Sequence, residues 1–249
     1  AELLDVAMVD SLGVPVEAPD RIAIYERDGG VAWRHFDSNT GDGAGRRARE
    51  LVVAFASAIG NYDYLFHWVF HQNGELSMEV ALSGILLPKG TAATPIEAPS
   101  CPGCTGHLVA PQVEAPNHQH FFSFRLDLDV DGAANSLLEA NVDALPQGQH
   151  NPDGNGFAKV ETVLGSEMEA RRDVDARRAR MWRVIAPESR NRLGNRSGYM
   201  LMPGSNAWPF LTAGNSTRQR ARFLDHHLWG TRYHDGELWA AGGYPNQSA

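Results

Sequence analysis

The sequence predicts an all-β protein, an antiparallel β-sandwich with little helix. Short apolar or alternating stretches recur along the whole chain, and Gly, Pro, Asn and Asp residues separate them. One pair of these stretches has the pattern of a β-hairpin. Helical periodicity is limited to brief turns at residues 137–140 and 217–223. A chain of 249 residues with many short strands and few helices is typical of a β-sandwich.

The clearest local pattern is a hairpin over residues 62–82. Aromatic residues occupy every second position of its first half, as in a strand with one aromatic face; they are Tyr62, Tyr64, Phe66, Trp68 and Phe70. The dipeptide Asn73-Gly74 follows, and it favours a two-residue turn in which both central positions have positive φ. Apolar residues then alternate with small or polar ones from Leu76 to Leu82, which predicts a return strand with one buried face.

Shorter alternating or apolar segments predict the remaining strands. We expect these strands at residues 4–9, 21–26, 31–35, 51–59, 118–130, 159–164, 181–186, 198–203 and 227–233. Residues 38–47, 88–117 and 133–158 are rich in Gly, Pro and polar residues, and we expect loops there. A loop as long as residues 88–117 is usually functional when it lies inside a compact domain.

Composition excludes two classes of function. The net charge of −8 argues against nucleic acid as a partner, because phosphate binding needs a clustered excess of Lys and Arg. The longest largely apolar run, residues 51–59, has nine residues, whereas a bilayer needs roughly 20, so we expect no membrane span. The chain begins at Ala1 with no signal region, so we expect either a processed product or part of a longer gene product.

A single C-x-x-C motif, Cys101-Pro-Gly-Cys104, lies in the long predicted loop. One such motif is not a disulfide framework. With His107 it has the spacing of a metal knuckle, but no fourth ligand is evident, so free thiols or a local disulfide are favoured over zinc. The sequence does not assign these cysteines a role.

The motif His118-Gln119-His120 opens the strand predicted at residues 118–130. Residues i and i+2 of a strand point the same way, so the two imidazoles would project side by side from an apolar face. A metal ion would satisfy both, and imidazole suits copper, zinc, iron or nickel. Hydrogen bonds to the backbone are an equally good explanation. A cupin-like site would need a carboxylate about four residues on, where the chain has Ser123 and Phe124.

The opposite face of the same predicted strand carries Asp127, Asp129 and Asp131. Carboxylates in a row repel one another unless water or a hard cation screens them, and calcium takes such oxygen ligands. A solvated acidic face explains the spacing equally well.

The tetrad Asn61-Tyr62-Asp63-Tyr64 lies at the start of the aromatic strand. A tyrosine there is ordinarily a core residue with a hydrogen-bonded hydroxyl. The tetrad, however, resembles the cofactor motif of the copper amine oxidases, N-Y-[DE]-Y, in which the first Tyr becomes topaquinone by self-processing with copper and dioxygen. The resemblance implies that Tyr62 is the quinone precursor, that Tyr64 lies close to the quinone and that Asn61 helps to position it.

The resemblance extends from about residue 3 to the last residues and is strongest to bacterial members. His118 follows Tyr62 by 56 positions, where the family places the first of its copper ligands, and His120 matches the second. Further segments that resemble the family are residues 59–64, 124–132, 187–193 and 228–233. Asp127, the backbone of Leu128, and Asp129 match a peripheral calcium or manganese site of some members. Ala58 departs from the family, which usually has Ser or Thr there.

The resemblance implies a primary-amine oxidase, which turns a small primary amine and dioxygen into an aldehyde, ammonia and hydrogen peroxide. It implies copper and topaquinone as cofactors, separate half-reactions with ping-pong kinetics, and a homodimer. We expect a soluble protein, in the bacterial cytoplasm rather than periplasmic or extracellular.

The organisation expected from the resemblance is one partial domain. Residues 1–249 would form part of the large catalytic β-sandwich domain, without the upstream segment that carries the catalytic-base aspartate and the downstream segment that carries the third copper histidine. We therefore expect the 249 residues alone to have little or no turnover. The alternative is a non-catalytic β-sandwich fragment or degenerate relative that binds metal weakly or not at all.

Overall fold

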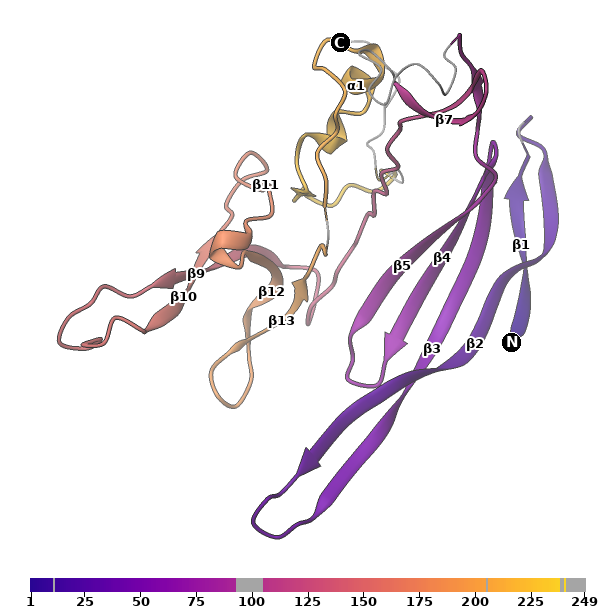
Figure 1. Cartoon of the computed structure of the whole chain (residues 1–249). Coiled ribbons are helices and arrows are strands. Elements are labelled where there is room, and N and C mark those ends of the chain that lie inside the picture. Colours follow the sequence, from indigo (N-terminus) through magenta and orange to yellow (C-terminus); the bar gives the residue numbers. More distant parts are fainter. Residues whose placement is uncertain (11, 93–104, 205, 238–239, 241–249) are drawn as a thin grey trace. The chain divides into compact units, whose positions relative to one another are not determined.

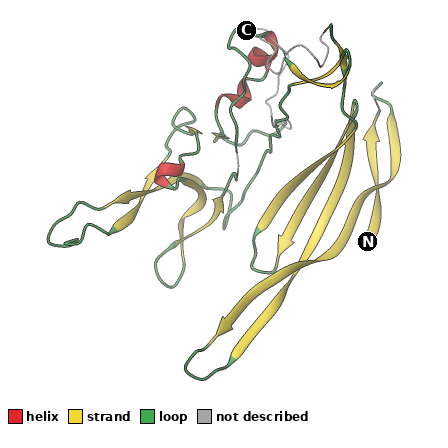
Figure 2. Cartoon of the chain, in the orientation of Figure 1, coloured by secondary structure: helices red, strands yellow, loops and turns green. Residues whose placement is uncertain are grey.

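The computed structural model describes residues 1–249 except 11, 93–104, 205, 238–239 and 241–249. The chain divides into two compact units, Ala1–His118 and Gln119–Ala249, and each is described by itself. Strands are the main regular secondary structure of both units, and helix is confined to short turns (Figure 2). All strand pairs in both units are antiparallel among the described residues, which confirms the predicted all-β antiparallel class. No helix in the described ranges is long and apolar enough to cross a membrane.

The first unit contains a five-stranded sheet in which each strand pairs with the next along the chain (Figure 1). Its strands are β1 (Glu2–Val9), β2 (Pro15–Phe36), β3 (Gly43–Ile59), β4 (Tyr62–His71) and β5 (Leu76–Gly84). The two strands predicted at 21–26 and 31–35 are one long strand, β2, because its pairing with β3 continues past Gly29-Gly30 through shifts of register. For the same reason β3 begins inside the loop expected at 38–47.

The predicted hairpin is confirmed, since β4 and β5 pair antiparallel from Tyr62 with Gly84 to Phe70 with Leu76. Its turn differs from the prediction. His71 accepts a hydrogen bond from the Gly74 amide at 3.1 Å and donates one to the Glu75 carbonyl at 2.9 Å, so the loop has three residues. Gly74 has φ of +87° and Asn73 does not have positive φ. The Asn73 carboxamide instead accepts a hydrogen bond from the Glu75 amide, which favours a type I turn followed by a left-handed glycine.

A small three-stranded sheet lies within the long loop predicted at 88–117. It contains β6 (Lys89–Gly90), β7 (Gly106–Ala110) and β8 (Val113–Pro116), in the order β6-β8-β7. Cys101 and Cys104, for which the sequence left several roles open, lie outside the described residues. The sheet matters for the site because β8 leads directly into His118.

The second unit contains a four-stranded antiparallel sheet in the order β10-β9-β12-β13 and a two-stranded one. Their strands are β9 (Ser136–Ala144), β10 (Phe157–Val163), β12 (Met181–Arg190) and β13 (Arg196–Leu201), with β11 (Arg171–Arg172) paired to β14 (Leu228–Trp229). The short helices are η1 (Ala176–Arg178), α1 (Ser216–Arg220) and η2 (Arg222–Asp225). Trp182, Leu138 and Ile185 form its core, each at most 1% exposed.

Two predictions for the second unit are wrong. The helical turn expected at 137–140 is the first half of β9, because pairing on both sides with β10 and β12 outweighs the helix propensity of Leu, Glu and Ala. The loop expected at 133–158 therefore contains a central strand. The strand expected at 227–233 is reduced to the two residues of β14, which pair with Arg171 and Arg172.

The strand predicted at residues 118–130 is also absent: 118–129 have no regular secondary structure. Alternating residues form a strand only when a neighbour completes the hydrogen-bond ladder, and no described segment pairs with this one. The apolar face expected to be buried is open at Phe124 and Leu126, which are 38% and 43% exposed, whereas Val130 is buried.

Candidate active site

Tyr62 opens β4, and the ladders on both sides fix its backbone. It pairs with Ile59 of β3 and with Gly84 of β5. The tight turn from β3 places Gly60 at φ of +62°. The Asn61 carbonyl accepts a hydrogen bond from the Ile85 amide at 2.7 Å, which ties the end of β5 to the residue before Tyr62. The Tyr62 side chain is half-buried.

Tyr64 lies two residues further along β4 and shares a face of the sheet with Tyr62. Its side chain is buried, with 8% of its surface exposed, and its cross-strand neighbours are Ser57 and Leu82. Asp63 is exposed on the opposite face. The strand therefore presents the two tyrosines together and separates the aspartate from them.

His118 follows the small sheet, and hydrogen bonds to backbone carbonyls fix the position of this segment. The Asn117 amide donates to the Thr105 carbonyl at 2.7 Å, and the Nδ1 atom of His118 lies 2.8 Å from the Pro116 carbonyl oxygen. A carbonyl can only accept, so Nδ1 carries the proton and Nε2 is the basic ring nitrogen. Anchoring one imidazole N–H on a backbone carbonyl is the usual way in which proteins orient a metal-binding histidine.

The Tyr62 and His118 rings lie next to each other, with centroids 5.4 Å apart and planes inclined by 40°. The two residues are 56 positions apart in sequence, and both belong to the first unit. The fold therefore brings together the phenol and the first imidazole that the sequence singled out. The sequence left backbone hydrogen bonds open as an explanation for these histidines, and His118 makes one, but its partner Pro116 was expected only as part of a loop.

The other predicted ligands lie in the segment without regular secondary structure. His120 is half-buried, while Asp127 and Asp129 are exposed in the irregular segment, with Leu128 half-buried between them. Within the described ranges, no group of three or more His, Cys, Asp or Glu side chains lies close enough to hold a metal ion. The predicted copper ligation by His120 and the predicted calcium or manganese site therefore stay predictions.

The face of the five-stranded sheet opposite Tyr62 carries an ion network. The Arg27 guanidinium lies 2.5 Å from Glu50 and 2.7 Å from Glu79. Its hydrogen bonds lower the pKa of Glu79 and raise the pKa of Arg27. His71 lies 2.9 Å from the Ser77 hydroxyl and 3.3 Å from Glu50, so this histidine is part of the network and separate from the Tyr62 face.

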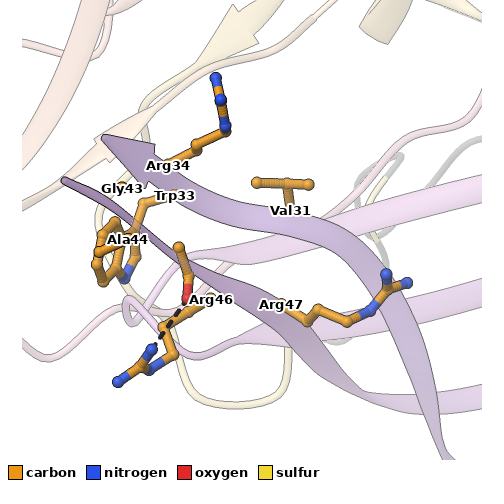
Figure 3. A pocket seen from close by; sticks show the side chains of 8 residues that line it. Val31, Trp33, Arg34, Gly43, Ala44, Arg46 and Arg47 are labelled. Carbon is orange, nitrogen blue, oxygen red and sulfur yellow. Dashed lines mark hydrogen bonds between the residues drawn. The ribbon is translucent and has the colours of Figure 1, made fainter. Parts of the chain in front are cut away.

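A cavity of about 340 Å³ lies far along the β2–β3 hairpin from Tyr62 (Figure 3). Its lining includes Val31, Trp33 and Arg34 of β2, with Arg46 and Arg47 of β3. The Arg46 guanidinium stacks over Trp33 and donates to the Gly45 carbonyl. Tyr62 pairs at the other end of β3, so this cavity is not part of the candidate site.

A buried carboxylate organises the second unit. Glu139 of β9 is 4% exposed and accepts hydrogen bonds from Arg172 at 2.5 and 2.8 Å, from Asn141 at 3.0 Å and from the Trp182 indole at 3.2 Å. Arg180 lies 3.2 Å away. Burial alone would raise the pKa of Glu139, but these hydrogen bonds outweigh it and lower the pKa to about 2. Every contact of this carboxylate is structural, so we assign it to stability.

Comparison with known proteins agrees with this fold. The family model described as copper amine oxidase, enzyme domain, matches residues 1–249. The chain thus has the all-β fold and the sequence features of an enzyme domain of the oxidoreductase class. It belongs to the copper amine oxidase family, as the sequence motifs predicted.

Individual relatives cover the whole length of this chain. The histamine oxidase of Arthrobacter globiformis is 40% identical over 240 residues, which are 96% of this chain and 34% of that protein. The primary amine oxidase of Klebsiella aerogenes is 35% identical over 257 residues, covering 100% of this chain and 34% of the relative. The structure of a copper-containing benzylamine oxidase from Hansenula polymorpha matches 99% of this chain and 38% of that chain, with a TM-score of 0.88 and 28% identity. The chain thus spans about a third of the length of the curated relatives.

Proposed function

We propose that this chain supplies the quinone-forming tyrosine and two copper ligands of a primary-amine oxidase. The observation that carries the proposal is the contact between the Tyr62 and His118 rings at 5.4 Å. An amine oxidase needs an electron sink that no ordinary side chain provides, so the reaction requires a cofactor, which the proposal places at Tyr62.

His118 fits a copper ion as one ligand. His118 has its Nδ1–H anchored on Pro116, which presents Nε2 as the ligand atom, and imidazole nitrogen is a preferred ligand of copper. In the proposal His118 and His120 hold the ion together with a third ligand. When bound, copper and the quinone derived from Tyr62 supply the redox chemistry by which amine, dioxygen and water become aldehyde, ammonia and hydrogen peroxide.

The side chains around Tyr62 orient the reacting ring. The Asn61 carbonyl accepts a hydrogen bond from the Ile85 amide, and this bond limits movement of the backbone at Tyr62. Tyr64 is buried beside it and covers part of the same face. In the proposal these two residues keep the Tyr62 ring in a fixed position relative to the imidazoles.

The proposed substrate is a primary amine. The relatives' names specify histamine oxidase, diamine oxidase and N-methylputrescine oxidase, which share an amine as the oxidised group and differ in the rest of the molecule. We extend only the shared group to this chain. A homodimer and a calcium or manganese site at Asp127, Leu128 and Asp129 complete the proposal by analogy with the family.

The test uses the full-length protein that carries this chain, loaded with copper in air. We expect a visible absorption band, a phenylhydrazine adduct and peroxide release on phenylethylamine. Tyr62→Phe should abolish all three, while the control Tyr199→Phe, at a site 55% exposed in β13, should leave them unchanged. A Tyr62→Phe protein that keeps the band, or a copper-loaded wild type that gives no adduct, would refute the proposal.

A second candidate is a non-catalytic β-protein that binds metal weakly. It is favoured by the absence of any three-residue metal-binding group among the residues that the structure describes. Copper titration distinguishes the two candidates: the oxidase requires about one tightly held copper per chain, lost in His118→Ala, whereas the non-catalytic protein would show weak binding that this substitution does not change.

A further inference from the structure

Gly84 lies in close contact with the backbone at Tyr62. A Cβ atom at this position would lie 2.4 Å from the Asn61 carbonyl oxygen, 2.7 Å from Tyr62 Cα and 2.8 Å from the Asp63 amide nitrogen. Gly84 also has φ of +104°, which side chains rarely adopt. The close approach accompanies the 2.7 Å hydrogen bond from the Ile85 amide to the Asn61 carbonyl. Only a glycine allows the end of β5 to lie this close to the tyrosine.

Gly106 makes a contact of the same kind at the anchor of His118. It pairs with Pro116 across β7 and β8. A Cβ atom on Gly106 would lie 2.4 Å from the Ala115 carbonyl oxygen and 3.0 Å from Pro116 Cα. Since the Pro116 carbonyl holds the Nδ1–H of His118, a displacement of β8 would move the imidazole with it.

These two glycines differ from the others described in the first unit. Gly13, Gly30, Gly41, Gly60 and Gly74 have positive φ, but an added Cβ would meet nothing within 4 Å. The two other described glycines of this unit with close neighbours also differ. An added Cβ on Gly29 would meet side chains, and one on Gly45 would meet a backbone oxygen at 3.2 Å, where the neighbour needs to move by only a few tenths of an ångström. Among the described residues of this unit, backbone contacts under 3.0 Å therefore occur at Gly84 and Gly106, beside Tyr62 and beside the anchor of His118.

We propose that Gly84 and Gly106 are positioning residues that set the separation between the Tyr62 and His118 rings. Each allows a strand to lie against the backbone that carries one ring, and a methyl group at either position forces that backbone away. The effect on quinone formation rests on the proposed function, because conversion of Tyr62 to a quinone requires the phenol to lie close to the metal. A displacement near 1 Å can cost about 100-fold in rate where reacting groups must be aligned.

The fold offers a matched control for each substitution. Gly74→Ala places an alanine at φ of +87°, in the turn before β5, where the added Cβ meets nothing within 4 Å. It therefore reproduces the backbone strain of Gly84→Ala without the clash. Gly90→Ala, in β6 of the small sheet, adds a methyl group that also meets nothing within 4 Å. It therefore controls for Gly106→Ala.

The experiment has two readouts on the full-length protein. Crystal structures of the metal-free variants measure the distance between the Tyr62 and His118 rings. We expect that distance to increase in Gly84→Ala and Gly106→Ala and to stay at its wild-type value in both controls. After copper is added in air, phenylhydrazine titration should show quinone formation slowed at least about tenfold in Gly84→Ala and Gly106→Ala alone. The electron paramagnetic resonance spectrum of the bound copper should change in Gly106→Ala.

The outcomes separate the inference from the proposed function. Unchanged ring distances in Gly84→Ala and Gly106→Ala overturn the inference, whatever the chemistry. Separated rings in a protein whose wild type makes no quinone support the positioning role and refute the proposed function. If Gly84→Ala does not fold, Ile85→Pro removes the amide that bonds to Asn61 without adding a Cβ at residue 84. The same increase in ring distance is then expected, and its absence overturns the role of Gly84.

Discussion

Replacing Glu139 by glutamine removes the charge at the centre of the buried network in the second unit. In the folded protein burial raises the pKa of Glu139, but hydrogen bonds from Arg172, Asn141 and Trp182 outweigh burial and lower the pKa from 4.5 to about 2. Since one pKa unit corresponds to about 1.4 kcal/mol, the network stabilises the ionised carboxylate by about 3 kcal/mol. Glutamine resembles the protonated acid and cannot accept both Arg172 hydrogen bonds. We therefore expect Glu139→Gln to lower the free energy of unfolding by about 3 kcal/mol at pH 7.

The lowered pKa of Glu139 also determines how the stability difference between wild type and Glu139→Gln changes with pH. The pKa of Glu139 is lower in the folded state than in the unfolded state, so its contribution is complete above about pH 4.5 and is lost as the pH falls toward 2. The difference in the free energy of unfolding between wild type and Glu139→Gln should therefore be largest near neutrality. It should shrink steadily between pH 4.5 and pH 2.

Urea unfolding followed by tryptophan fluorescence at pH 7, 4.5, 3.5 and 2.5 measures this difference. Glu188→Gln is the matched control, because Glu188 is exposed on β12 and the same substitution there should change stability by less than about 0.5 kcal/mol. A difference between wild type and Glu139→Gln that is the same at pH 7 and at pH 2.5 would refute the reasoning.

Two further predictions concern the core and the ion network. Leu138→Ala should lower the free energy of unfolding by about 2–5 kcal/mol in urea denaturation, because Leu138 is 1% exposed and leaves a cavity, whereas Leu126→Ala, at a residue 43% exposed, should cost much less. Arg27→Ala should raise the pKa of Glu79 toward its ordinary value in an NMR titration, because the Arg27 hydrogen bond is the main cause of its lowering; an unchanged pKa would contradict this.

Local patterns were sufficient for elements whose partner is the next segment of chain. The alternation of aromatic residues from Tyr62 to Phe70 predicted β4 and its hairpin with β5, since a hairpin needs only its own two strands. The prediction failed for β9, where pairing with β12, distant in sequence, decides between helix and strand. It failed again at residues 118–130, which are not part of any sheet among the described residues.

Some features of the candidate site could be identified from the sequence, and others only from the structure. The tetrad at Asn61 and the histidines at 118 and 120 were identifiable from the sequence, because their resemblance to a family motif depends on residue types and spacing. The role of Pro116 and the close contacts of Gly84 and Gly106 were not, because a glycine in a sequence does not reveal which backbone lies against it.

By itself the sequence determined the all-β class, the hairpin that opens at Tyr62 and membership of the copper amine oxidase family. The tertiary structure alone decided that the Tyr62 ring meets the His118 ring at 5.4 Å. The reason is physical: side-chain alternation is set by neighbouring residues, whereas the distance between two rings 56 positions apart depends on how a separate small sheet holds the backbone at His118.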